Sequence, residues 1–96
     1  MARPPTVEVS AEELEALFKA LNIWAKIQDG RLTTSLVPNK TRPSWDYEGG
    51  SSEIVRHENT AGYHVATTHR ITAPEGSVPH WDAKDLHIGD IVIWCE

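Results

Sequence analysis

The sequence predicts an α+β domain in which one N-terminal amphipathic helix packs on a bent antiparallel sheet of four or five strands. Three observations support this fold class. Apolar residues recur every three or four positions over residues 10–28, glycine- and proline-marked turns divide the remainder, and 96 residues suffice for one core. We therefore expect a single domain, 1–96, with an N-terminal arm at 1–9 and a mobile loop at 39–52.

The helix has a clear start and end signal. Ser10 is expected to be its N-cap, and Glu13 stands three residues later, where it completes a capping box. Gly30 follows the last turn and can adopt the left-handed conformation that ends many helices. The spacing places five apolar side chains on one face: Leu14, Leu17, Phe18, Leu21 and Trp24.

The rest of the chain has strand and turn composition. Residues 31–37 predict a strand that ends at Pro38, and the glycine, proline and serine content of 39–52 predicts the loop. Residues 82–85 are expected to form a short turn or a helical kink. Turn residues at 60–62, 74–77 and 89–90 separate four further strands, at 53–59, 63–72, 78–81 and 91–95.

Histidines are the first candidates for chemistry. Alternation along 63–72 places Tyr63, Val65 and Ile71 on the same face as His69, and we expect this face to be the core. His69 is then a core histidine hydrogen-bonded to a carbonyl or hydroxyl group. The alternative is a general base or metal ligand at the rim of a pocket.

His80 and Asp82 form the densest local group. Two residues apart on a strand, they project from one face and can form a histidine–carboxylate pair or supply two metal ligands. A zinc or iron site needs a third ligand, which His57 or His69 would have to provide. No complete ligand set stands at a recognisable spacing, so the sequence predicts neither a metal nor a cofactor.

An acid–base hydrolytic or nuclease-like site is the second possibility. Histidine and carboxylate groups can transfer protons, and arginine or lysine can neutralise phosphate charge. A serine nucleophile is not indicated, because no Gly-x-Ser-x-Gly turn is present, and Cys95 is expected to be a buried thiol. The candidates for such a site are His57, His69, Arg70, His80, Asp82 and Lys84.

Aromatic residues suggest a binding surface. Four tryptophans is a large number for this length, and tryptophan is enriched at interaction hot spots. Both faces of strand 91–95 are apolar, which predicts that a second copy of the chain covers one of them. The expected binding residues are Trp45, Tyr47, Trp81 and Trp94.

Charge and composition narrow the function classes. A net charge of −5 disfavours nucleic-acid binding, and the longest apolar run is far shorter than the roughly 20 residues of a membrane span. One cysteine and the lack of an apolar leader favour the cytoplasm. We expect a non-catalytic interaction module that forms a homodimer or binds a protein or small ligand. The alternative is a small hydrolase or a metal-binding protein built on the histidine–aspartate–arginine set.

Overall fold

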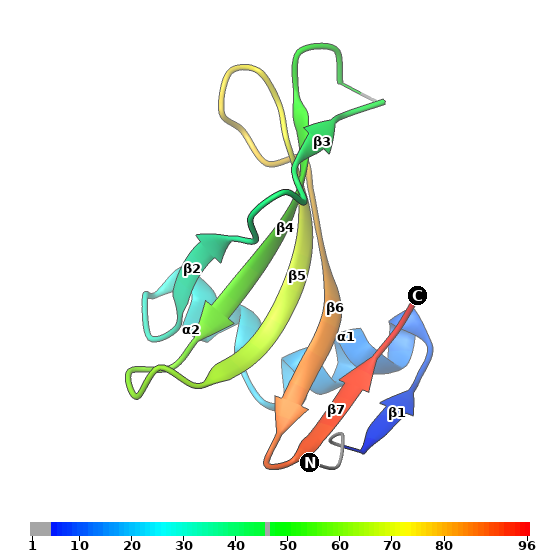
Figure 1. Cartoon of the computed structure of the whole chain (residues 1–96), viewed down its shortest axis with the longest axis vertical. Coiled ribbons are helices and arrows are strands. Elements are labelled where there is room, and N and C mark those ends of the chain that lie inside the picture. The colour runs from blue at the N-terminus through cyan, green and yellow to red at the C-terminus, as the bar shows by residue number, and fades with distance from the viewer. Residues whose placement is uncertain (1–4, 46) are drawn as a thin grey trace.

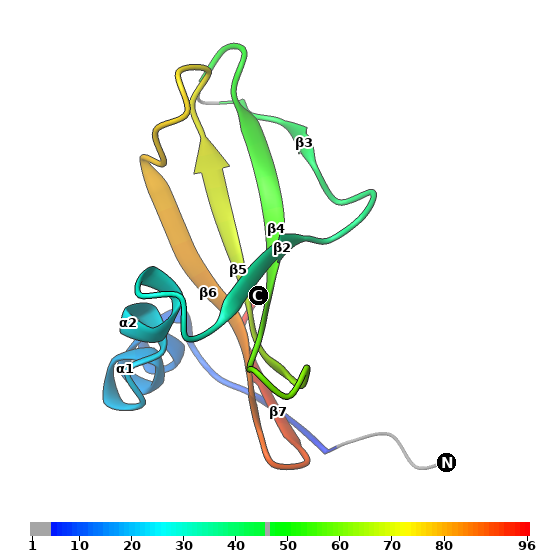
Figure 2. The same ribbon diagram turned by 90° about the vertical axis from the view of Figure 1, so that its left-hand side faces the viewer.

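The computed structural model describes residues 5–45 and 47–96, and these form an α+β fold (Figure 1). Seven mostly antiparallel strands make one sheet in the order β1-β7-β6-β5-β4-β2, with β3 also paired to β4. Both helices lie against the same face of the sheet (Figure 2), and the other face has no helix over it in the described chain. The elements are β1 (Thr6–Glu8), α1 (Ala11–Ala20), α2 (Ile23–Gln28), β2 (Thr33–Leu36), β3 (Arg42–Pro43), β4 (Ser51–Glu58), β5 (His64–Thr72), β6 (His80–Ile88) and β7 (Ile91–Trp94).

The predicted single helix is in fact two. The start is confirmed: the Ser10 hydroxyl accepts a hydrogen bond from the Glu13 N–H, and the Glu13 carboxylate accepts one from the Ser10 N–H. Asn22 then adopts a left-handed conformation with φ of 56° and separates α1 from α2. Asparagine tolerates this conformation better than most residues. The break lets α2 bury Ile23 and Ile27 against the sheet.

The sheet has more strands than predicted. The arm expected at 1–9 contains β1, which pairs in parallel with β7, and the loop expected at 39–52 contains β3, which pairs with the start of β4. β1 is three residues long and β3 is two, so neither shows an alternation by which the sequence could identify it. They form because a longer strand already offers unpaired backbone groups at its edge.

The turn predicted at 82–85 is wrong, because these residues lie inside the nine-residue strand β6. The register between β5 and β6 shifts from Thr68↔Ala83 to Thr67↔Asp85, and Lys84 is the extra residue of this bulge. The Ala83 N–H donates to the Glu15 carboxylate of α1 at 3.0 Å. The helix therefore satisfies a backbone donor at the irregularity.

The core lies between the helices and strands β5 and β6. It contains Leu14, Phe18, Ile23, Ile27, Leu32, Ala66, Ala83, Leu86 and Cys95. The core face predicted for β5 is wrong. Ala66 and Thr68 are fully buried, whereas Tyr63 is 71% exposed. His69 therefore faces away from the helices, and His57 of β4 is the fully buried histidine. Alternation holds along 66–72, and the core lies on the face opposite to the predicted one. The register shift after His57 leaves Val65 as an extra residue and places His64 on the same face as His69.

Among the described residues, neither helix is long and apolar enough to cross a membrane.

Candidate functional site

The face of the sheet without helices (the open face) carries two groups of histidine and aspartate side chains from β5 and β6. Their residues alternate with core residues along each strand, and the bulge at Lys84 keeps both groups on one face. Within each group, one candidate ligand atom per residue lies within 4.8 Å of the others. The first group is His64, Asp85 and His87, and the second is His69, His80 and Asp82.

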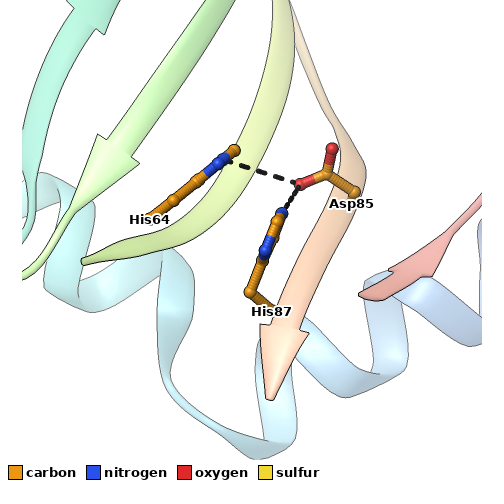
Figure 3. A group of neighbouring side chains, drawn as sticks. All are labelled: His64, Asp85 and His87. Atoms are coloured by element: carbon orange, nitrogen blue, oxygen red, sulfur yellow. Dashed lines mark ion pairs between the residues drawn. The ribbon is translucent and has the colours of Figure 1, made fainter. Parts of the chain in front are cut away.

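In the first group, two imidazoles approach one carboxylate oxygen (Figure 3). Asp85 Oδ1 lies 3.2 Å from His87 Nε2 and 3.8 Å from His64 Nε2. The two rings stack with their centroids 4.0 Å apart. Asp85 Oδ1 is buried, and within the described chain it has no hydrogen-bond partner, even though His87 Nε2 is close. A buried carboxylate oxygen without a hydrogen-bond donor carries a desolvation cost.

The surroundings of His64 favour its neutral form. Burial, followed by the proximity of His87, lowers the pKa of His64. Its Nε2 also lies 3.0 Å from the Ala66 carbonyl oxygen and 2.8 Å from the Thr67 hydroxyl. Neutral imidazole is the form that binds metals, and two imidazoles with a carboxylate are a common ligand set for first-row divalent ions.

In the second group, every polar atom near the centre has a partner. Asp82 Oδ1 is 3.0 Å from His69 Nδ1 and 2.9 Å from His80 Nε2, and Asp82 Oδ2 is 3.3 Å from Lys84 Nζ. His69 Nε2 lies 2.7 Å from the Ser52 hydroxyl oxygen. The third residue beside His80 and Asp82 is therefore His69, one of the two that the sequence allowed.

The remaining two acid–base candidates lie on the helix side and are structural. His57 is buried between the hydroxyls of Thr34 and Thr68, at 3.2 and 2.7 Å. Burial lowers the pKa of His57 to about 4. Arg70 donates to the buried Glu53 carboxylate at 2.7 Å and lies over the Trp81 ring. Four of the six candidates thus come together, and these two do not.

The aromatic candidates occupy different surroundings. Trp45 is fully exposed in the segment between β3 and β4, and Tyr47 is partly exposed nearby in the chain. Trp81 packs edge-on against Trp24 and donates to the Thr68 hydroxyl on the helix side. Trp94 is half-buried and pairs with Asp85, on the open face.

Two hollows lie on the open face beside the histidine groups. A cavity of about 540 Å³ is next to His64, and its lining includes Lys40 and Arg56. A smaller one of about 290 Å³ is lined by Tyr47, His69, Ile71, Pro79 and His80. A small ligand could therefore reach His64 of the first group, and His69 and His80 of the second.

Sequence reasoning missed Ser52, His64, Asp85 and His87. Asp85 and His87 have the same two-residue spacing as His80 and Asp82, so the same signal was present. The turn expected at 82–85 concealed this signal, because residues two apart project from the same face only within a strand.

No protein-family model, curated protein or solved structure matches this chain significantly. The fold and its side chains define a small α+β protein with two histidine–carboxylate groups on one open sheet face.

Proposed function

We propose that this protein binds one divalent transition-metal ion through His64, Asp85 and His87. The observation that carries the proposal is the buried Asp85 Oδ1, which lacks a hydrogen bond and faces two imidazole nitrogens. A cation at this point would satisfy the carboxylate oxygen and use the lone pairs of both rings, once His64 Nε2 gives up its hydrogen bond to the Ala66 carbonyl. The proposal departs from our expectation from the sequence that the chain binds no metal.

The interatomic distances favour the first group over the second. Ligand atoms about 2.0–2.1 Å from a tetrahedral zinc ion lie roughly 3.3 Å from one another. The two separations from Asp85 Oδ1, 3.2 and 3.8 Å, bracket this value. In the second group the separations from Asp82 Oδ1 are 2.9 and 3.0 Å, and shared protons already account for them as hydrogen bonds.

Three protein ligands leave at least one coordination position for water or for an exchangeable ligand. His64 also lines the 540 Å³ cavity, where Lys40 supplies positive charge and Arg56 is in an ion pair with Glu58. A small anionic molecule in this cavity could therefore reach the open position. This arrangement suits Lewis-acid chemistry or activation of a bound water molecule.

The proposal is tested by titrating the purified full chain with Zn²⁺ in a calorimeter and with Co²⁺ by visible absorption. We expect one ion per chain and an absorption band typical of nitrogen and oxygen ligands. Asp85→Asn and His87→Gln should each abolish or strongly weaken binding, because each removes one of three ligands. His80→Gln is the matched control and should bind as the unmodified chain does.

Two results would overturn this assignment. One is the absence of saturable binding by a chain whose circular dichroism shows that it is folded. The other is binding that survives Asp85→Asn and is lost in His80→Gln or Asp82→Asn, which would place the ion in the second group instead.

A second candidate function is the interaction module that the sequence suggests. The supporting observation is the fully exposed side chain of Trp45, with Tyr47 partly exposed two residues later. An indole in water is an apolar surface available to a partner. Self-association and a cytoplasmic location belong to this same proposal.

A further inference from the structure

Independently of metal binding, we propose that Ser52, His69 and Asp82 form a nucleophile–base–carboxylate relay that hydrolyses activated esters of small acyl groups. Ser52 Oγ lies 2.7 Å from His69 Nε2, and His69 Nδ1 lies 3.0 Å from Asp82 Oδ1. This order of atoms is the one by which a histidine activates a serine hydroxyl while a carboxylate holds the ring.

Three adjacent strands set this geometry. His69 of β5 stands directly opposite Asp82 of β6, and Ser52 of β4 stands opposite Ile71, two residues along β5 from His69. All three side chains therefore lie on the open face. The His69 imidazole contacts Asp82 directly across on β6 and Ser52 diagonally across on β4. Lys84 Nζ at 3.3 Å from Asp82 Oδ2 further orients the carboxylate.

The hydrogen bonds are compatible with one productive tautomer. With the proton on Nδ1, His69 donates to Asp82, and its Nε2 is free to accept the proton of the Ser52 hydroxyl. His80 Nε2 is also 2.9 Å from Asp82 Oδ1 and can donate to it. The carboxylate can thus stabilise the imidazolium that forms when Ser52 loses its proton.

The adjoining hollow indicates the substrate class. Its volume is about 290 Å³, and Tyr47, Ile71 and Pro79 give it an aromatic and apolar wall beside the His69 and His80 rings. Such a wall suits a short acyl chain or an aryl leaving group and contains no cation for a carboxylate or phosphate. We therefore assign small, neutral aryl or alkyl esters as substrates.

In the first half of the reaction, Ser52 Oγ attacks the acyl carbon and its proton passes to His69 Nε2. The bond from the acyl carbon to the leaving oxygen breaks, and His69 returns the proton to that oxygen. In the second half, water attacks the acyl-serine, His69 takes the proton of the water and returns it to Ser52 Oγ. The products are a carboxylic acid and an alcohol or phenol.

The sheet limits which leaving groups the relay can expel. Strands β5 and β6 have neighbours on both sides, so the ladder uses most of their backbone N–H groups, and the Ala83 N–H at the bulge donates to Glu15. These N–H groups therefore do not stabilise an oxyanion. Losing one oxyanion donor costs an acyl-transfer enzyme about 10²–10³-fold in rate. We therefore expect cleavage of esters with good leaving groups, such as nitrophenyl esters, and not of amides.

The test combines covalent labelling with kinetics on the full chain. In the presence of a chelator, a fluorophosphonate should bond to Ser52 with loss of fluoride, and mass spectrometry of peptides should locate the label. Cleavage of p-nitrophenyl acetate should fall on the order of 10²-fold in Ser52→Ala and in His69→Gln, since both remove acid–base activation of the hydroxyl.

Ser51→Ala is the matched control. Ser51 is the preceding residue, and its hydroxyl donates to Glu53 on the opposite face, so labelling and ester cleavage should persist in this variant. Circular dichroism and thermal melts establish that each variant is folded. The relay is disproved if Ser52 in the unmodified chain takes up no label, or if Ser52→Ala cleaves the ester as fast as Ser51→Ala does. Neither result depends on Asp85 or on metal.

Discussion

His57 shows how burial sets the properties of a single residue. Its side chain is fully buried on the helix side of β4, and the hydroxyls of Thr34 and Thr68 lie next to its two ring nitrogens. Desolvation disfavours the imidazolium, and the pKa of His57 falls from 6.5 to about 4. The folded protein therefore keeps His57 neutral at pH values where an unfolded chain would protonate it.

This pKa shift predicts a loss of stability in mild acid. Between pH 6.5 and about 4 the unfolded state binds a proton at His57 that the folded state excludes, so the free energy of unfolding decreases as the pH falls. We expect His57 to account for a loss on the order of 2 kcal/mol by about pH 4.5, measured by urea denaturation at several pH values.

His57→Gln is the control for this prediction. It should be less stable than the unmodified chain at pH 7, because it disturbs two buried hydrogen bonds, and its stability should depend less on pH. An equal dependence on pH in both proteins would contradict the prediction.

At the scale of elements, Glu15 joins α1 to both α2 and the sheet. Its carboxylate accepts from the Trp24 indole N–H at 2.9 Å and from the Ala83 N–H of β6 at 3.0 Å. Trp24 in turn packs against Phe18 and Trp81. One acidic side chain thus holds the helix pair at the point where β6 bulges.

Glu15→Gln should therefore destabilise the fold. The amide nitrogen of glutamine can only donate, so one of the two N–H groups loses its acceptor, at a cost of about 2 kcal/mol. Chemical denaturation measures the change. Glu12→Gln, at an exposed position one turn earlier in α1, should change stability by less than about 0.5 kcal/mol. Equal effects of the two substitutions would rule out the bridging role of Glu15.

For the whole molecule, the β7 end of the sheet is where self-association is expected. β1 pairs with the edge of β7, and Val92 and Trp94 remain half-buried on the open face. Val7, Ile88 and Ile91 are exposed apolar residues at the same end of the sheet, but they project from the opposite face. A second copy of the chain packed on the open face here would remove the apolar surface of Val92 and Trp94 from water.

We predict a homodimer through this surface. Light scattering coupled to gel filtration should give twice the chain mass. Val92→Lys should give the mass of one chain, because a charge replaces an apolar contact on the open face. Lys40→Ala, on the cavity at the β2–β3 connection, is a control that should remain dimeric. A single-chain mass for the unmodified protein at high micromolar concentration would refute the dimer.

Local chemistry in the sequence determined several features of the fold without help from the rest of the chain. Ser10 and Glu13 specify the start of α1, and Gly30, Gly62 and Gly76 occupy left-handed positions where the predicted helix and turns end. Such features depend on side-chain and backbone interactions within a few residues, which a sequence shows directly.

Only the tertiary structure decided which side chains meet on the open face. The apolar spacing predicts one helix, but Asn22 interrupts it. The break is stabilised because it lets Ile23 and Ile27 pack in the core. The extra residue Val65 at the β4–β5 register shift places His64 on the open face, and the extra residue Lys84 of β6 places Asp85 and His87 there with it. A one-residue shift moves every later side chain to the other face, and the pairing that causes it involves strands distant in the sequence.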